Sequence, residues 1–229
     1  HMTAGKDLAA LTVRNYRTDL APLVEFMRLR TFPDLKSLDR YALRGYLAWL
    51  VELGYARSSI VRKLSALRTF LRWLLRERLI DQDPLPRRGV MKRESRLPRF
   101  LSQDEAARLI EAPDTAEDLG IRDRALLELI YAGGLRVSEA TDLNVAGVNL
   151  ETKELRVTGK GRKERVVLVG TAARDALALY LRQVRPGLVS RGSGDALFLN
   201  RYGGRLGQRS IQEKVRRYAA RVGLRSDVH

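Results

Sequence analysis

Residues 132–169 read AGGLRVSEATDLNVAGVNLETKELRVTGKGRKERVVLV, and this stretch carries the strongest structural signals in the chain. Gly133-Gly134 favours a sharp turn that ends one helix. Residues 137–143 are expected to form a second, short helix. Beyond it, two runs rich in Val and Leu flank Gly159-Lys160-Gly161, a pattern typical of a β-hairpin. The stretch therefore predicts helix, turn, helix and hairpin in that order.

Arg136 stands where the short helix begins. Free backbone N–H groups and the helix dipole attract anions to such a position, and a guanidinium can form two parallel hydrogen bonds with a phosphate. Glu139, one turn further on, is placed to hold that arginine. The same spacing also fits a helix end followed by a surface Arg–Glu pair, so the residues alone leave both interpretations open.

Two further basic sites are candidates for anion binding. Lys160, on its glycine-flanked turn, can reach outward to pair with a phosphate or donate a proton, although the residues around it do not form a P-loop. The tract from Asn200 to Arg205, with Arg209 at the next helix start, offers backbone N–H groups and guanidinium groups. The alternative for each is a solvated turn.

The rest of the chain predicts a mainly α protein with a small antiparallel β-sheet. Residues 3–82 show apolar side chains at three-to-four spacing and are expected to form a helical domain. Residues 83–99 contain prolines, a glycine and a cluster of Arg and Lys, which is typical of an extended basic linker. Residues 100–229 form the second predicted domain, beginning with a Ser102/Glu105 capping box.

Helix boundaries in the first domain rest on cap signals. Ser37 or Asp39 can cap the second helix, and Ser58 or Ser59 can open the third. In the second domain, Pro186-Gly187 is expected to end the helix that starts at Thr171.

The chain of 229 residues has 43 Lys and Arg against 27 Asp and Glu, a formal net charge of +16. The surplus is spread over both halves, which favours a nucleic acid as partner and, second, an anionic membrane surface. With no cysteine and with histidine only at positions 1 and 229, disulfides, thiol catalysis and internal His clusters are excluded. His1-Met2 is interpreted as a cloning remnant. No apolar run is long enough to cross a bilayer and the start shows no secretory pattern, so a cytoplasmic protein is expected.

Several motifs together resemble the tyrosine recombinases, also called phage-type integrases, and particularly the Xer-type recombinases. They are RDRALLELIYAGG from Arg122, GLRVSEATDL from Gly134 and VTGKGRKERVVLV from Val157, preceded by LTVRNYRTDL and SSIVRKLSALRTFLRWL in the first domain. The resemblance extends over essentially the whole chain.

The resemblance implies a two-domain architecture, with a helical, SAM-like core-binding domain and an α+β catalytic domain around duplex DNA. It implies cleavage through a 3′-phosphotyrosyl bond without metal or other cofactor. Arg136 would then bind the non-bridging oxygens of the scissile phosphate and Lys160 would protonate the leaving 5′-oxygen, while Glu139 supports the site. The implied partners are a double-stranded recombination site and further recombinase protomers, with no membrane.

The sequence departs from the family pattern at its end. The family continues with H-x-L-R, a second His or Trp and the nucleophilic Tyr, whereas this sequence stops at Ser226-Asp227-Val228-His229. His229 lies at or just before the H-x-L-R histidine. Tyr180, Tyr202 and Tyr218 are interpreted as structural. The expectation is a truncated recombinase with an incomplete catalytic domain, which binds DNA without completing cleavage.

Further DNA contacts are expected from helix starts rich in Ser and Arg and from basic turns. The predicted residues are Thr12, Arg14, Tyr16, Arg17, Ser58, Ser59, Arg62, Lys63, Arg68, Arg162 and Arg209. Each also fits an ordinary solvated face. Competing hypotheses for the whole chain are a non-enzymatic DNA-binding regulator on the same scaffold and an RNA-binding basic protein.

Overall fold

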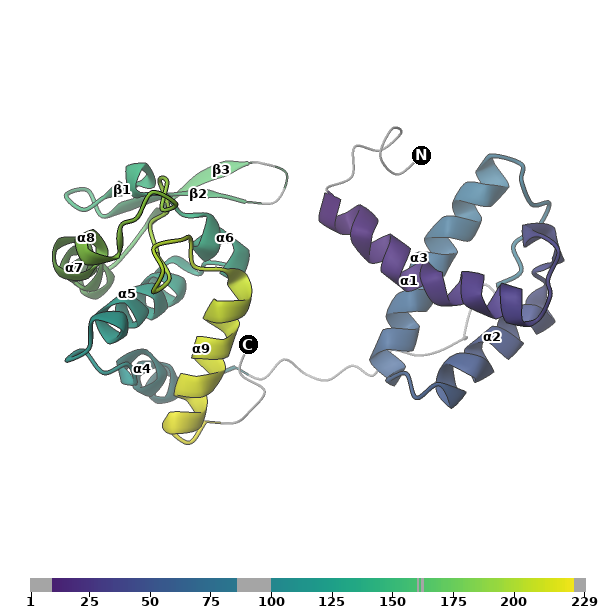
Figure 1. Ribbon diagram of the computed structural model, residues 1–229, viewed down its shortest axis with the longest axis horizontal. Helices are drawn as coiled ribbons and strands as arrows, with labels where there is room; N and C mark the ends of the chain where they lie inside the picture. The colour runs from purple at the N-terminus through teal and green to yellow at the C-terminus, as the bar shows by residue number, and fades with distance from the viewer. Residues whose placement is uncertain (1–9, 86–99, 160, 162, 225–229) are drawn as a thin grey trace. The chain divides into compact units, whose positions relative to one another are not determined.

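The computed structural model describes residues 10–85, 100–159, 161 and 163–224, and the chain divides into two compact units, 1–98 and 99–229. The described part of the first unit is helical, and the second combines helices with a small sheet (Figure 1). The predicted fold class is thus confirmed. Lys160, Arg162, His229 and most of the predicted linker lie outside the described residues.

The first unit contains α1 (Ala10–Leu29), the 3₁₀ turn η1 (Leu35–Ser37), α2 (Arg40–Glu52) and α3 (Arg57–Arg76). Of the two caps left open by the sequence, Asp39 is the one that caps α2, accepting a hydrogen bond from the backbone N–H of Ala42 at 2.7 Å. The expected serine cap of α3 is wrong. The backbone N–H of Ile60 already donates to the carbonyl of Ala56, so the helix has started before either serine.

The core of the first unit is rich in aromatic side chains. Phe26 on α1 lies with its ring centre 5.5 Å from that of Tyr46 and 5.7 Å from that of Trp49, both on α2. Burial raises the pKa of Tyr46 well above its ordinary value. Leucines from α3 complete the core, which packs the three helices together.

The second unit begins with α4 (Gln103–Glu111), α5 (Asp118–Gly133) and α6 (Val137–Asp142). The predicted capping box of α4 is confirmed, with Ser102 and Glu105 hydrogen-bonded to each other's backbone N–H groups. α5 ends where predicted, because Gly134 adopts φ 54°, a left-handed conformation in which a side chain is strained.

A three-stranded antiparallel sheet follows, in the order β1 (Val148–Asn149), β2 (Glu154–Thr158) and β3 (Glu164–Leu168). Val157 lies directly opposite Arg165 in the β2–β3 hairpin. Residues opposite each other share one face of a sheet, and Val157 is fully buried. Arg165 therefore lies on the face that packs on the core.

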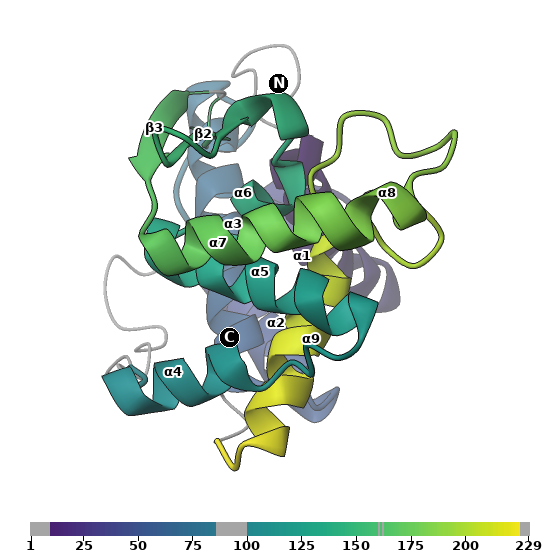
Figure 2. The same ribbon diagram turned by 90° about the vertical axis from the view of Figure 1, so that its left-hand side faces the viewer.

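The remaining elements are α7 (Thr171–Leu179), a π-helical turn (Tyr180–Val184), α8 (Arg185–Leu188) and α9 (Gln208–Arg221). Pro186-Gly187 does not end the helical segment as predicted, because proline is tolerated in the first turn of a helix and α8 begins one residue before it. In Figure 2, α7 runs across α5, and the two helices pack together.

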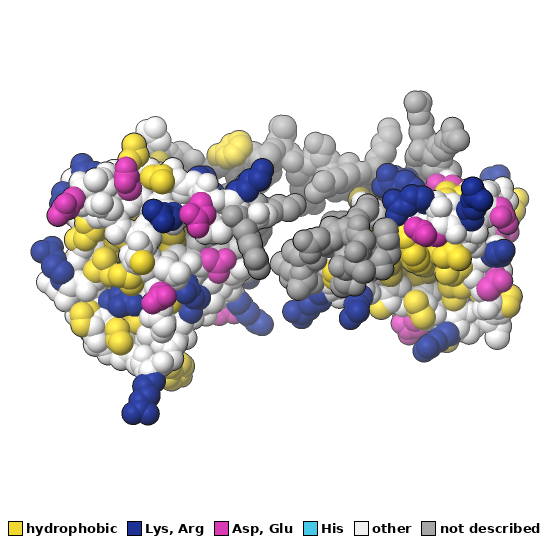
Figure 3. Space-filling view, turned by 90° about the horizontal axis from the view of Figure 1, so that it is seen from above, with side chains coloured by type: hydrophobic (Ala, Val, Ile, Leu, Met, Phe, Trp, Pro, Cys, Tyr) yellow, Lys and Arg dark blue, Asp and Glu magenta, His cyan; other side chains and the backbone are white. Residues whose placement is uncertain are grey.

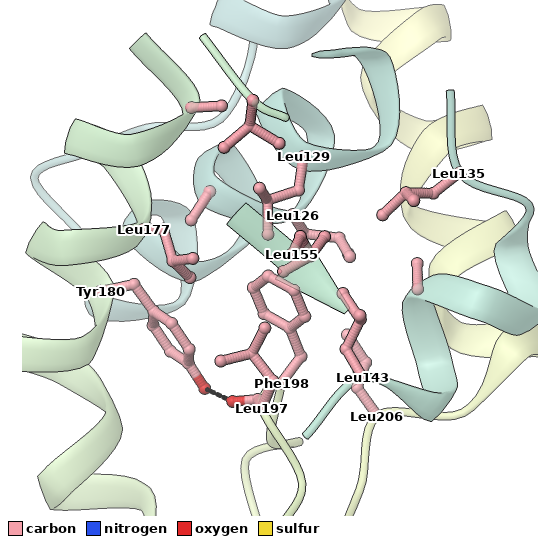
Figure 4. Packing of buried hydrophobic residues seen from close by; sticks show 14 of the residues in the cluster. Leu126, Leu129, Leu135, Leu143, Leu155, Leu177, Tyr180, Leu197, Phe198 and Leu206 are labelled. Atoms are coloured by element: carbon pink, nitrogen blue, oxygen red, sulfur yellow. Dashed lines mark hydrogen bonds between the residues drawn. The ribbon is translucent and has the colours of Figure 1, made fainter. Parts of the chain in front are cut away.

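The core of the second unit joins these helices to the sheet. Figure 4 shows Leu126 of α5, Leu155 of β2 and Leu177 of α7 around Phe198. Tyr180 is fully buried, and its hydroxyl donates to the Leu197 carbonyl at 3.2 Å. Over the described ranges, every helix is too short or too polar to span a membrane.

Candidate functional site

Arg136 occupies the turn between α5 and α6. Gly134 reverses the chain after α5, and two residues later the carbonyl of Arg136 accepts the first hydrogen bond of α6, from the N–H of Ala140 at 2.9 Å. The Arg136 side chain is 73% exposed. The predicted cation is therefore presented to solvent at a helix N-terminus.

Glu139 is buried beneath that arginine, at 3% exposure. Its Oε2 accepts the backbone N–H of Arg136 at 2.9 Å, and its Oε1 accepts a guanidinium N–H of Arg136 at 3.0 Å. Arg165 of β3 donates to the same two oxygens, at 2.8 and 2.9 Å. These three residues are called the Glu139 cluster below.

The Glu139 cluster carries an excess of positive charge. Hydrogen bonds from Arg165, and secondarily from Arg136, lower the pKa of Glu139 from 4.5 to about 2, against the opposing effect of burial. Bonding to Glu139 raises the pKa of Arg165. Two guanidinium groups and one carboxylate leave a formal charge of +1. Among the described residues, Glu139 is the only hydrogen-bond partner of the Arg136 guanidinium, which leaves most of its N–H groups available to an anion.

The base of the hairpin lies against this cluster. The Gly159 N–H donates to the Lys163 carbonyl at 2.8 Å. A methyl group built on Gly159 would lie 3.5 Å from both Oε1 of Glu139 and a guanidinium nitrogen of Arg165. The residue before Lys160 is thus beside the Glu139 cluster, while Lys160 itself lies outside the described residues and its role stays a prediction.

The predicted DNA contacts of the first unit lie on α1 and α3. The exposed ones are Arg14, Arg17, Ser58, Arg62 and Arg68, and the half-buried ones are Thr12, Tyr16 and Ser59. In the view of Figure 3, Lys and Arg side chains border a group of hydrophobic side chains on this unit.

Lys63 requires a correction, because its side chain is only 4% exposed. Its ammonium lies 3.7 Å from Asp19, bonds the Thr18 carbonyl at 3.4 Å and sits 4.9 Å from the ring centre of Tyr55. Asp19 also pairs with Arg62. Lys63 therefore joins α1 to α3, and its ammonium is buried instead of exposed to solvent.

In the second unit the other predicted basic residues have different surroundings. Arg209, in the first turn of α9, is 92% exposed and pairs with Glu213 at 3.0 Å. Arg205 donates to the carbonyls of Thr141 and Leu143 at 2.8 and 3.0 Å, so this part of the tract anchors a loop to the end of α6. Arg162 lies outside the described ranges.

A second buried carboxylate was not singled out by the sequence. Asp123 on α5 accepts hydrogen bonds from Arg122 at 2.7 and 2.9 Å, from Lys214 at 2.8 Å and from the hydroxyl of Tyr218 at 2.7 Å. Lys214 and Tyr218 belong to α9. These four residues, called the Asp123 cluster, hold α9 against α5.

Arg165 is the functional candidate that sequence reasoning missed. A signal for it exists: a charged residue on the core-facing side of a strand needs a buried partner of opposite charge. Finding that partner requires the hairpin register and the position of α6. Within the described part of the chain, no group of three or more His, Asp or Glu side chains could hold a metal ion.

Comparisons with known proteins show the family to which the chain belongs. The sequence model of the phage integrase family matches residues 99–229, and that of the phage integrase N-terminal SAM-like domain matches residues 1–78. Tyrosine recombinase XerC of Pelotomaculum thermopropionicum is 40% identical over 233 residues, which cover 98% of this chain and 76% of the relative. Tyrosine recombinase XerD of Staphylococcus epidermidis is 35% identical over 219 residues, covering 96% and 74%.

A solved structure shares the fold. The XerH site-specific recombinase bound to its difH substrate, in a pre-cleavage complex, superimposes with a TM-score of 0.72 at 23% identity. The match covers 97% of this chain and 66% of that one. At this identity the likeness supports the fold alone.

Proposed function

Because the chain belongs to the phage integrase family of tyrosine recombinases, we propose that it binds a duplex DNA recombination site through the Glu139 cluster and the neighbouring hairpin. Arg136 hydrogen-bonds the non-bridging oxygens of the scissile phosphate. Lys160 donates a proton to the 5′-oxygen as it leaves. Further protomers of the recombinase occupy the same DNA site.

The observation that supports this assignment is the exposed guanidinium of Arg136 above a buried, doubly bonded Glu139. Strand cleavage forms a bond between a tyrosine oxygen and phosphorus while the bond from phosphorus to the 5′-oxygen breaks. Negative charge then grows on the phosphate oxygens, and fixed cations stabilise it. The 5′-oxygen takes up a proton, for which the hairpin lysine is the donor in this proposal.

We further propose that the 229 residues contain no counterpart of the family's second arginine or of its nucleophilic tyrosine. Tyr180 and Tyr218 are buried and hydrogen-bonded, and exposed Tyr202 stacks on Arg201. We therefore expect this polypeptide to bind its site without completing cleavage.

The first experiment measures DNA binding by gel shift, with a duplex selected from a random library by the 229-residue chain. We expect the affinity to fall steeply with salt, roughly 10³-fold between 50 and 200 mM, if six or more phosphates are contacted. A flat salt response would contradict the proposal. Structured RNA competing as well as the duplex would favour the RNA-binding hypothesis instead.

The second experiment looks for covalent protein–DNA adducts on duplexes of the selected site, each nicked at a different phosphate so that a released fragment diffuses away. No adduct is expected from the 229-residue chain. A robust adduct would show that one of its own tyrosines acts as nucleophile. If DNA binding proves wholly indifferent to Arg136→Ala and Lys160→Ala, a non-enzymatic DNA-binding regulator is the better account.

A further inference from the structure

Arg165 links two parts of the proposed site that are separate in the sequence. It lies on β3 opposite buried Val157 and bonds both oxygens of Glu139, at 2.8 and 2.9 Å. Glu139 belongs to α6 and also bonds the backbone and the guanidinium of Arg136. One buried carboxylate therefore joins the second strand of the hairpin to the helix start that carries Arg136.

The second arginine changes what Arg136 can do. Without Arg165, Glu139 would be a buried carboxylate with Arg136 as its one guanidinium partner. Opposite charges attract strongly where water is scarce, so Arg136 would turn further onto Glu139 and offer fewer N–H groups to DNA. With Arg165 present, each carboxylate oxygen also accepts a guanidinium N–H of Arg165, and Arg136 gives Glu139 only one guanidinium bond. Its side chain stays 73% exposed.

The same contact fixes the base of the hairpin. Gly159 closes it through the hydrogen bond to Lys163, and a methyl group at Gly159 would lie 3.5 Å from Arg165 and Glu139. The strands on either side of residue 160 are therefore held against α6 by Arg165.

We propose that Arg165 is a positioning residue, an inference that rests on the proposed function. Arg165 neutralises and orients Glu139, keeps Arg136 available to the DNA phosphate and holds the base of the Lys160 hairpin. It acts through Glu139. Replacing it should loosen the hairpin and remove the phosphate contact of Arg136 together.

The test compares Arg165→Gln with Arg124→Ala in the 229-residue chain, with Arg165→Ala as a more drastic second variant. Arg124 is a matched control, because it bonds Glu128 on the same helix through two guanidinium nitrogens, at 3.0 and 3.2 Å, outside the proposed site. Far-UV circular dichroism establishes that each variant is folded.

The first readout is hydrogen exchange of the Gly159 amide by NMR. We expect exchange about tenfold faster in Arg165→Gln, because the local opening of the hairpin becomes easier, and wild-type exchange in Arg124→Ala. The second readout replaces each phosphate of the selected duplex in turn with a neutral methylphosphonate. In wild type several replacements should weaken binding, and Arg136→Ala should abolish the sensitivity at one of them. Arg165→Gln should reduce the same sensitivity at least severalfold, and Arg124→Ala should preserve it.

Wild-type behaviour of folded Arg165→Gln in either readout overturns the positioning role. If no phosphate of the selected duplex shows sensitivity that depends on Arg136, the proposed function has failed instead. The hydrogen-exchange readout then still decides whether Arg165 holds the hairpin.

Discussion

Two of the buried carboxylates of the second unit, Asp123 and Glu139, are each hydrogen-bonded by two cationic side chains, yet the exposure of those cations differs. In the Asp123 cluster Arg122 is itself 1% exposed and gives its remaining bond to the Leu199 carbonyl at 2.9 Å. In the Glu139 cluster, Arg136 is 73% exposed.

This difference separates a cluster that holds helices together from one that can bind a ligand. In the Asp123 cluster, desolvation lowers the pKa of Lys214 and raises that of Tyr218, as expected for groups that the fold has taken out of water. In the Glu139 cluster the acid is also buried, but one guanidinium hydrogen-bonded to it stays mostly in solvent. The exposed Arg217 approaches Asp123 only to 3.8 Å, which is longer than a hydrogen bond. The exposure of the cation, rather than the burial of the acid, marks the candidate site.

The largest effect is expected from Asp123→Asn. It leaves Arg122 and Lys214 without their counterion in the core, and breaking a buried pair in this way costs about 3–5 kcal/mol of unfolding free energy. Urea unfolding followed by circular dichroism measures it. Both tryptophans, Trp49 and Trp73, lie in the first unit, so their fluorescence should report an unchanged transition there. A loss of unfolding free energy below 1 kcal/mol would contradict a stabilising role of the Asp123 cluster.

Arg136→Ala should weaken DNA binding strongly and change stability little. Because the side chain is exposed, the unfolding free energy should change by no more than about 1 kcal/mol. Binding to the selected duplex should weaken about 10- to 100-fold, since hydrogen bonds to a charged phosphate contribute about 1.5–3 kcal/mol. Gel shifts and urea unfolding of the same preparation test both halves. A stability loss like that of Asp123→Asn would mean that the two clusters do not differ in kind.

A pH titration tests how ionised Glu139 contributes to the stability of the second unit. Its pKa in the fold is about 2, below the ordinary 4.5, so its contribution to stability is complete above pH 4.5 and is lost as the pH falls toward 2. The stability difference between wild type and Glu139→Gln should therefore shrink from pH 5 to pH 3. A difference that stays constant over this window contradicts the assigned pKa.

The smallest effect on DNA binding is expected from Arg124→Ala, which removes an (i,i+4) pair with the buried Glu128. Because Glu128 is buried, the loss of its partner should lower the unfolding free energy by about 1–3 kcal/mol, whereas DNA affinity should not change. Urea unfolding and gel shifts provide the measurement. A binding defect comparable to that of Arg136→Ala would show that the loss of any arginine in this unit weakens DNA binding. The Glu139 cluster would then have no specific role in binding.

What the sequence predicted well depends on neighbouring residues. The turn at Gly134, the capping box at Ser102 and the hairpin around Gly159 are set by local backbone conformation and by side-chain periodicity, and all three are present. The pairing of Arg136 with Glu139 was also predicted, because one helical turn separates them.

What the sequence did not predict depends on contacts between distant segments. Arg165 meets Glu139 only through the strand register, and Asp123 meets Lys214 across 91 positions of the chain. The burial of Lys63 follows from how α1 packs on α3, whereas its neighbour Arg62 remains exposed. Adjacent basic residues thus have different roles that composition cannot distinguish.

The central claim is that Arg136 and Lys160 act on one DNA phosphate. The direct test repeats the methylphosphonate replacement along the selected duplex with wild type, Arg136→Ala and Lys160→Ala. The account predicts that both variants lose sensitivity at the same phosphate and keep it at the others. Loss at two different phosphates, or at none, would contradict it.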